Sequence, residues 1–260
     1  MDLGLSGRRA IVLGSSRGLG FASARSLAAE GAHVTLTGRN ADRLAAARAE
    51  LAATGAAVEA VSLDVSDHAG LAAALDHLLE RTGFDILVNN SGGPAPGPIA
   101  AVDTERWRQE FDAMVASLFF VTERLLPAMR TRKWGRIINI ASSGVVQPIP
   151  NLGVSNSLRA AVVGWAKTLA GEVAADGVTV NTVLPGRIDT ERVGELDAAA
   201  AKRTGRSVDE VAADSRKTIP VGRYGDPGEF GDVVAFLAST RASFITGSVI
   251  RVDGGMIRSI

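Results

Sequence analysis

Three glycines between two apolar segments constrain what this 260-residue chain can fold into. Gly14, Gly18 and Gly20 follow an apolar run at residues 10–13, and a helix-like segment then leads to a second apolar run ending at Gly38–Arg39–Asn40. Glycines in this order permit a sharp turn from strand to helix, and they let backbone N–H groups approach a phosphate at the positive end of that helix. The stretch therefore predicts a strand–helix–strand unit that binds a dinucleotide.

The spacing G-x-x-x-G-x-G differs from the G-x-G-x-x-G of ordinary dinucleotide fingerprints. Taken alone, it is also compatible with glycines that only pack a helix tightly against a sheet. Its context, with a strand on each side of the helix, favours the dinucleotide interpretation. We therefore predict that the nucleotide contacts a loop that includes Gly14, Ser16, Arg17, Gly18, Leu19 and Gly20.

Strand-like and helix-like segments alternate along the rest of the chain. We expect strands at 58–63, 85–88, 136–141, 178–183 and 248–252, and helices at 43–54, 69–81, 104–130, 155–174 and 227–239. Because no Pro-, Gly- or Ser-rich linker divides the chain, residues 1–260 are predicted to form one α/β domain with a doubly wound parallel sheet. Residues 192–220 fit either a mobile helical lid or a merely solvated insertion.

The composition points to a small-molecule partner. Lys plus Arg and Asp plus Glu number 28 each, so no net charge favours nucleic acid or a membrane surface. Cysteine is absent, and His33, His68 and His77 lack metal-ligand spacing, so neither thiol chemistry nor a metal site is predicted. No apolar run approaches the roughly 18 residues of a membrane span, and no signal peptide is recognised, so we expect a cytoplasmic protein.

Several turns should meet at one edge of the predicted sheet. The segment from Asn89 to Gly93 follows the fourth strand, Ser142 follows the fifth, and the segment from Pro185 to Thr190 follows the sixth. Ligands of such sheets lie beyond the carboxyl ends of the strands, so these turns should face the same crevice as the glycine loop.

Taken together, these landmarks resemble the short-chain dehydrogenase/reductase family, especially its 3-oxoacyl carrier-protein reductase-like members. The resemblance rests on the glycine loop, Asp64–Val65, Asn89–Asn90 with Gly92, Ser142, Pro185–Gly186 and Asp253–Gly254–Gly255, and it covers essentially the whole chain. It implies a Rossmann-type sheet of about seven strands, a nicotinamide cofactor and a homo-oligomer, commonly a tetramer built partly on two long helices.

The resemblance also implies roles for individual residues at the cofactor site. Asp64 would accept a hydrogen bond from the adenine amino group, and Asn90 would line the adenosine ribose, whereas Ile188 and Thr190 would border the nicotinamide carboxamide and the pyrophosphate. Asp64 could instead cap the following helix, and Ile188 could belong to the core. The cofactor-binding set that the family motifs imply is completed by Val65, Gly92, Pro185 and Gly186.

Charge at the end of the second strand predicts the choice of cofactor. An NAD site usually presents a carboxylate to the ribose 2′-hydroxyl, whereas an NADP site presents arginine to the 2′-phosphate. The strand ends without an acid at Gly38–Arg39–Asn40, and Arg17 lies in the glycine loop. Because a guanidinium pairs with phosphate through parallel hydrogen bonds, these two arginines favour NADP(H), unless they only face water.

The catalytic positions of the family are largely replaced. The family uses Tyr-x-x-x-Lys on one helix, a Ser at the preceding strand end and an Asn on the helix before that. Aligned on residues 160–164, this chain has Ser155 at the Tyr position, Arg159 at the Lys position and Met114 at the Asn position, and only Ser142 is kept. A serine hydroxyl is a far weaker acid than a phenol, whose pKa is about 10, and Arg159 could bind the cofactor ribose but not exchange protons.

Three hypotheses follow. The first is an NADP-dependent reductase of the carbonyl/alcohol type that works through Ser142, with Ser155, water or a substrate group as proton source. The second is a nucleotide-binding protein without redox turnover, and the third is a non-redox enzyme on the same fold. We favour the first. The only tyrosine, Tyr224, is expected to be structural, and the sequence does not identify the substrate.

Overall fold

A parallel sheet of seven strands forms the centre of the protein. The computed structural model describes residues 1–81 and 83–259. All strands run parallel, in the order β3-β2-β1-β4-β5-β6-β7, as expected for a doubly wound α/β domain. The strands are β1 (Arg9–Val12), β2 (His33–Gly38), β3 (Val58–Ser62), β4 (Ile86–Asn89), β5 (Gly135–Ile140), β6 (Val178–Pro185) and β7 (Val249–Val252).

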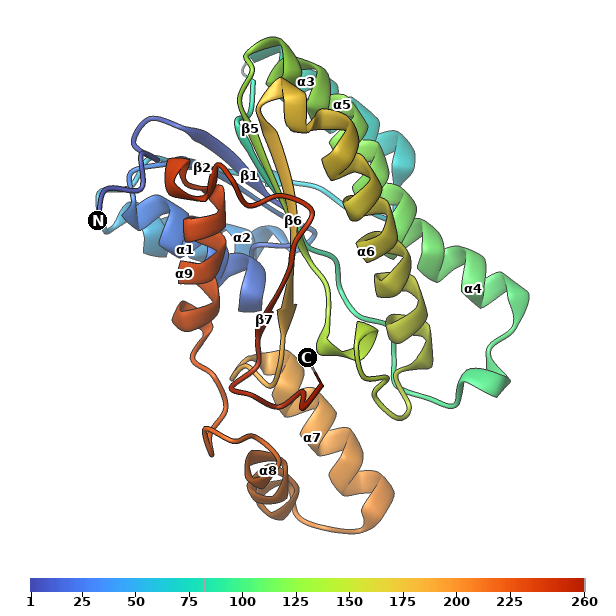
Figure 1. The fold of residues 1–260 in the computed structure, drawn as a ribbon. Helices are drawn as coiled ribbons and strands as arrows, with labels where there is room; N and C mark the ends of the chain where they lie inside the picture. Colours follow the sequence, from blue (N-terminus) through green and yellow to red (C-terminus); the bar gives the residue numbers. More distant parts are fainter. Residues whose placement is uncertain (82, 260) are drawn as a thin grey trace.

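Helices cover both faces of this sheet (Figure 1). On one face, α1 (Gly18–Ala29), α2 (Ala41–Ala52) and α9 (Pro227–Ala238) enclose a core that contains Leu27, Leu44 and Phe230. On the other, α3 (His68–Arg81), α5 (Ser117–Thr131) and α6 (Gly153–Val173) enclose a second core. Since both faces are covered, the central strands β4, β5 and β6 are buried along almost their whole length, polar residues included.

Several predicted boundaries are displaced by one or two residues. The helix expected at 43–54 is α2, Ala41–Ala52, because the Asn40 side chain accepts a hydrogen bond from Arg43 N–H at 2.8 Å and so starts the helix earlier. The helix expected at 155–174 is α6, Gly153–Val173, and the strand expected at 178–183 continues to Pro185 as β6.

The helix expected at 104–130 is not uniform. It consists of α4 (Thr104–Phe111), a π-helical turn η2 (Asp112–Ala116) and α5. The wide turn buries Met114 and Val115, and the Ser117 hydroxyl donates to the carbonyl oxygen of Ala113 at 2.9 Å. Such turns interrupt helices often near functional sites, and no residue pattern in this segment had indicated one.

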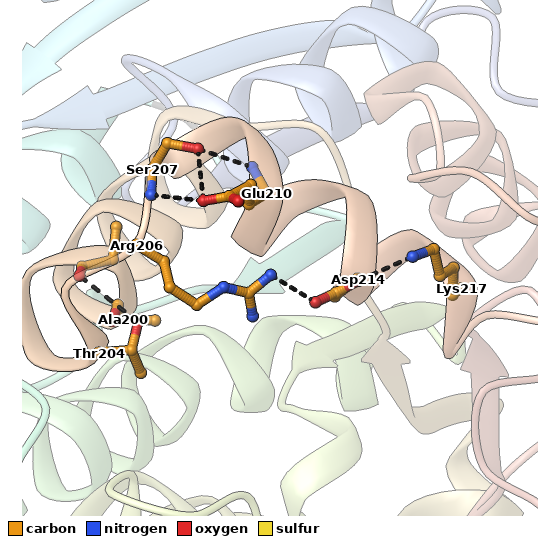
Figure 2. Close-up of polar contacts among 8 residues, drawn as sticks. Ala200, Thr204, Arg206, Ser207, Glu210, Asp214 and Lys217 are labelled. Atoms are coloured by element: carbon orange, nitrogen blue, oxygen red, sulfur yellow. Dashed lines mark hydrogen bonds and ion pairs between the residues drawn. The ribbon is translucent and has the colours of Figure 1, made fainter.

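Residues 192–220 contain two helices that lie beyond the carboxyl ends of the strands. They are α7 (Glu191–Thr204) and α8 (Val208–Lys217), joined at Gly205, whose φ of +68° ends α7 in a left-handed conformation. Figure 2 shows polar contacts within α8 and the residues just before it: Ser207 and Glu210 form a capping box, and Asp214 pairs with Arg206 and with Lys217. The distances of these two pairs are 2.6 Å and 2.9 Å.

The direction of chain progression across the sheet reverses between β1 and β4, and the glycine loop lies at this point. A Cβ atom at Gly20 would approach the Gly14 carbonyl oxygen to 2.4 Å, so α1 can meet the end of β1 this closely only with glycine there. A crevice for a ligand is expected at such a switch point.

Substitution of Gly20 should therefore destabilise the fold, whereas substitution of another helical glycine should not. Gly20→Ala is expected to destabilise the fold by roughly 1–3 kcal/mol, since the methyl group would have to displace backbone. Gly171→Ala, in α6, is the matched control; its Cβ would meet nothing within 4 Å, and it should stabilise by about 0.5–1 kcal/mol. Urea unfolding of both variants measures the difference, and equal stabilities would contradict the packing argument.

The contacts of Asp214 should stabilise α8 only locally. Hydrogen bonds from Lys217 and then Arg206 lower the pKa of Asp214 to about 2, so these contacts persist above the ordinary Asp pKa of about 3.9 and are lost as the pH falls toward 2. Asp214→Asn should mimic this loss at neutral pH, raising amide hydrogen exchange in 205–217 while leaving the melting temperature nearly unchanged. Asp209→Asn on the same helix is the control, and equal exchange in the two variants would contradict the prediction.

Candidate functional site

A cavity of about 920 Å³ lies beyond the carboxyl ends of the central strands. Its size is near the upper end of the range for ligand pockets, as a dinucleotide with a small molecule would require. The structure brings nearly all predicted cofactor and catalytic residues into its lining: Gly14, Ser16, Arg17, Gly18, Leu19, Arg39, Asp64, Val65, Asn90, Gly92, Ser142, Ser155, Arg159, Pro185, Gly186, Ile188 and Thr190. Gly20 lies behind this lining, against Gly14.

The glycine loop has a backbone suited to a phosphate. Gly14 and Gly18 have φ values of +56° and +59°, and a Cβ atom at Gly18 would meet nothing, so this part of the loop is open. The Asn90 side chain donates to the carbonyl oxygens of Leu13 at 3.2 Å and Gly14 at 3.1 Å. Asn90 therefore holds the loop at the end of β1 as well as lining the cavity, and the residues present fit a dinucleotide.

Three arginines lie where the second strand meets the glycine loop. Arg17 forms an ion pair with Glu191 of α7, and Arg43 approaches the same carboxylate at 3.7 Å. Arg39 lies 4.0 Å from Asp64, and its side chain is 74% exposed. Arg43 was missed in the sequence; its position in the first turn of the helix after the second strand was the available signal. A phosphate can take the place of the Glu191 carboxylate as the partner of these arginines.

Asp64 closes a turn instead of capping the next helix. Its Oδ1 atom accepts hydrogen bonds from the backbone and hydroxyl of Ser66 at 2.9 and 2.7 Å, whereas Asp67 accepts from Gly70 N–H at the start of α3. Partial burial acts to raise the pKa of Asp64, but the bonds from Ser66 and the charge of Arg39 outweigh it, so that pKa is lowered. The carboxylate is ionised and free to accept a further hydrogen bond at Oδ2.

Ile188 and Thr190 border the opposite wall of the cavity. Ile188 is 3% exposed and packs in the core on the α1 side of the sheet, as the alternative for it expected, and it also lines the cavity. The Thr190 hydroxyl donates to the Ile188 carbonyl oxygen at 3.3 Å, and α7 begins at the next residue.

Two serines and a methionine also line the cavity. The Ser142 hydroxyl accepts from Gly144 N–H at 3.0 Å, which leaves its own proton available to a ligand. Ser155, at the start of α6, is 8% exposed, and its hydroxyl has no hydrogen-bond partner among the described residues. Met114 is 3% exposed and presents no polar group.

Arg159 links the ends of two strands. Its Nη1 donates to the Ile140 carbonyl oxygen at 2.9 Å, and its Nη2 donates to the carbonyl oxygens of Ser91 at 3.1 Å and Gly92 at 3.4 Å. Burial, and then the neighbouring charge of Arg192, lower the pKa of Arg159 to about 10, so the guanidinium remains positive at neutral pH. A fixed positive charge therefore lies in the cavity lining.

Arg192 is a second cation of the cavity that the sequence did not indicate. It stands in the first turn of α7, and its Nη2 donates to the Pro94 carbonyl oxygen at 2.8 Å. The contact joins segments 98 residues apart in the chain, so no local pattern could have revealed it.

Tyr224 lies outside the cavity lining. Its hydroxyl donates to Asp197 at 2.7 Å, and the same carboxylate pairs with Arg187 at 2.6 Å. Burial, together with the Asp197 charge, raises the pKa of Tyr224, which makes the phenol a weaker acid. These contacts agree with a structural role.

Residues 1–81 and 83–259 contain neither a helix that could span a membrane nor a cluster that could bind a metal. No helix there is long and apolar enough to cross a membrane. Nor do three or more His, Cys, Asp or Glu side chains come together there in a way that could hold a metal ion.

The sheet order and the cavity at its switch point define a Rossmann-type protein with a dinucleotide-binding crevice. A family model described as enoyl-(acyl carrier protein) reductase matches residues 14–257. The 3-oxoacyl-[acyl-carrier-protein] reductase FabG of Aquifex aeolicus is 35% identical over 260 residues, covering 98% of this chain and 100% of that protein. The chain belongs to the short-chain dehydrogenase/reductase family.

Two solved structures are similar to this chain over all or nearly all of its length. L-sorbose reductase from Gluconobacter frateurii, complexed with NADPH and L-sorbose, has a TM-score of 0.94 and 35% identity, with 100% of both chains covered. A 3-oxoacyl (acyl-carrier-protein) reductase from Agrobacterium tumefaciens C58 with NADP bound has a TM-score of 0.87 and 31% identity, covering 97% of this chain and 95% of that one.

The structural role of Tyr224 has a direct test. Tyr224→Phe should lower the free energy of unfolding by about 1 kcal/mol, because one hydrogen bond to Asp197 is lost. Nucleotide affinity and any turnover should change by less than about twofold. Loss of turnover with unchanged stability would show instead that this phenol takes part in the chemistry.

Proposed function

We propose that this protein is an NADP(H)-dependent oxidoreductase that interconverts a carbonyl compound and an alcohol, as 3-oxoacyl reductases do. The observation that carries the proposal is that one cavity contains both the glycine loop with its arginines and the free hydroxyl of Ser142. Relatives named for carbonyl reduction and solved with NADPH or NADP support it.

The adenosine end of the cofactor would lie between the glycine loop and the second strand. The loop backbone would hold the pyrophosphate, and Arg17, Arg39 and Arg43 would surround the ribose 2′-phosphate. When bound, NADPH supplies the hydride for the reduction. We infer that α7 and α8 form a lid over this site, since Glu191, Arg192 and Leu196 of α7 line the cavity.

Ser142 would orient and polarise the substrate carbonyl. Because its oxygen already accepts from Gly144 N–H, its proton is directed to another acceptor, and a carbonyl oxygen is suitable. Arg159 would stabilise negative charge that develops on that oxygen. Neither tyrosine nor lysine lines the cavity among the described residues, so the proton would come from water held by Ser142 and Ser155 or from the substrate.

The absence of tyrosine and lysine from the described cavity lining favours a second candidate, a nucleotide-binding protein without redox turnover. Ser155, Arg159 and Met114 replace the three groups through which the family transfers the proton. In that case the cavity would bind NADP(H) but would not reduce carbonyl compounds.

We also infer a homo-oligomer. Phe244 is fully exposed, and Phe236 and Val249, on α9 and the edge strand β7, are 38% and 44% exposed. Apolar groups on an edge strand and the adjoining helix suit contact with a second copy of the chain.

Calorimetric titration with NADPH and NADH tests the cofactor. NADPH should bind at least tenfold more tightly, and Arg43→Gln should reduce NADPH affinity by about tenfold, because it removes a charge-assisted contact with the 2′-phosphate, while leaving NADH affinity unchanged. Arg48→Gln, on the same helix, is the control. Equal or tighter binding of NADH would contradict the NADP assignment.

Oxidation of NADPH with a panel of ketones, oxo acids and 3-oxoacyl thioesters then separates the two candidates. The reductase predicts turnover that Ser142→Ala lowers by about 10²-fold. Absence of turnover in the native protein, with turnover created by Ser155→Tyr combined with Arg159→Lys, would favour the nucleotide-binding protein.

A further inference from the structure

Two guanidinium groups bind one short backbone segment at the end of β4. Arg159 of α6 donates to the carbonyl oxygens of Ser91 and Gly92, and Arg192 of α7 donates to that of Pro94. A Cβ atom at Gly93 would lie 3.2 Å from Arg192 Nη2, so the second guanidinium lies directly against this segment. Residues 91–94 thus hold two cations from different helices close together in the cavity.

Few negative charges compensate these cations. Arg159 forms no ion pair within the described residues; its three bonds are to neutral carbonyl groups. Arg192 has one carboxylate neighbour, Glu195, at 3.3 Å, and Glu195 also lies 3.7 Å from Arg17. The charge of Arg192 accordingly adds to burial in lowering the pKa of Arg159.

Both guanidinium groups keep donors for a ligand. A guanidinium has five N–H groups in a planar fork. Among the described contacts, Arg159 leaves its Nε–H and one Nη1–H unused, and Arg192 leaves three N–H groups unused. Carboxylate is the small organic anion that such a fork binds with two parallel hydrogen bonds.

We propose that Arg192, with Arg159, holds a carboxylate of the substrate, so that the protein reduces an oxo acid to the corresponding hydroxy acid. This rests on the proposed function. The reduction converts C=O to CH–OH: the hydride from NADPH adds to the carbonyl carbon, one proton adds to the oxygen, and NADP⁺ leaves. The carboxylate is unchanged and only fixes the distance between the charged end and the reacting carbon.

The position of the pair favours the substrate over the cofactor as its ligand. The cofactor phosphates have other partners, in the glycine loop and the cluster of Arg17, Arg39 and Arg43, and the Glu195 carboxylate lies between that cluster and Arg192. Arg159 instead binds Ile140, two residues before Ser142, whose hydroxyl would meet the reacting carbonyl. Apolar side chains of Met114, Leu152 and Met256 line the same cavity, which suits a short carbon chain.

The test compares acids with their neutral amides. Protein saturated with NADP⁺ is titrated by calorimetry with pyruvate, acetoacetate and levulinate, and with the primary amide of each, because these acids place the carbonyl at increasing distance from the charge. At least one acid should bind about tenfold or more tightly than its amide. Arg192→Met should abolish this preference, Arg192→Lys should restore part of it, and Arg203→Met, which removes another cation of α7 from the cavity lining, should leave it unchanged.

The outcomes separate this inference from the proposed function. If acids and amides bind equally, or if Arg192→Met keeps the preference, the carboxylate site is wrong even where carbonyl reduction occurs. If an acid binds through Arg192 but no panel compound is reduced, the carboxylate site stands as a binding site and the redox function fails. NADPH affinity must stay within about twofold in Arg192→Met; a larger loss would assign Arg192 to the cofactor and overturn the inference.

Discussion

The close approach of α1 to the end of β1 is the constraint on which the site depends. Gly20 allows this approach, since any side chain there would collide with the Gly14 carbonyl oxygen, and Asn90 holds the loop from the neighbouring strand. The loop can then present backbone N–H groups at the start of a helix, which is where an anion is favoured. The arginines add charge to a site that the backbone has already shaped.

Among the residues that the structure describes, neither tyrosine nor lysine lines the cavity, and Arg159 supplies a fixed positive charge there. Arg159 is fixed by three carbonyl groups and cannot move a proton at neutral pH, and Ser155 supplies only a hydroxyl. On the proposed function, the chain's own residues would bind, orient and polarise a carbonyl compound, while the proton would come from water or from the substrate. The proposed carboxylate site at Arg192 would add recognition of a charged substrate to this arrangement.

Much of this could be predicted from the sequence, because the informative signals are local. Apolar runs followed by Gly14, Asn90, Ser142 or Pro185 mark the ends of parallel strands, and the geometry of such sheets brings those ends together. The parallel, doubly wound sheet and the turns that line the cavity followed from this rule. The helix starts could not be predicted from this rule. Asn40, for example, starts α2 two residues before the apolar pattern does.

Other features depend on contacts between distant segments. Arg192 meets Pro94 across 98 residues, and Arg43 meets Glu191 only because α7 folds over the glycine loop. Likewise, no distinctive residue composition marks the π-helical turn at Asp112–Ala116. Residue type and spacing along the chain contain no information about such contacts. The residues that line the cavity around Arg192 could therefore be identified only in the folded protein.

The central claim is that the crevice holds a phosphorylated nicotinamide nucleotide with its reactive ring beside Ser142 and no phenol or amine within reach. A crystal structure of the complex with NADP⁺ tests it most directly. The account predicts the 2′-phosphate among Arg17, Arg39 and Arg43, and the nicotinamide ring between Ile188 and Ser142. A 2′-phosphate directed into solvent, a blocked crevice, or Tyr224 or a lysine turned toward the nicotinamide ring would contradict it.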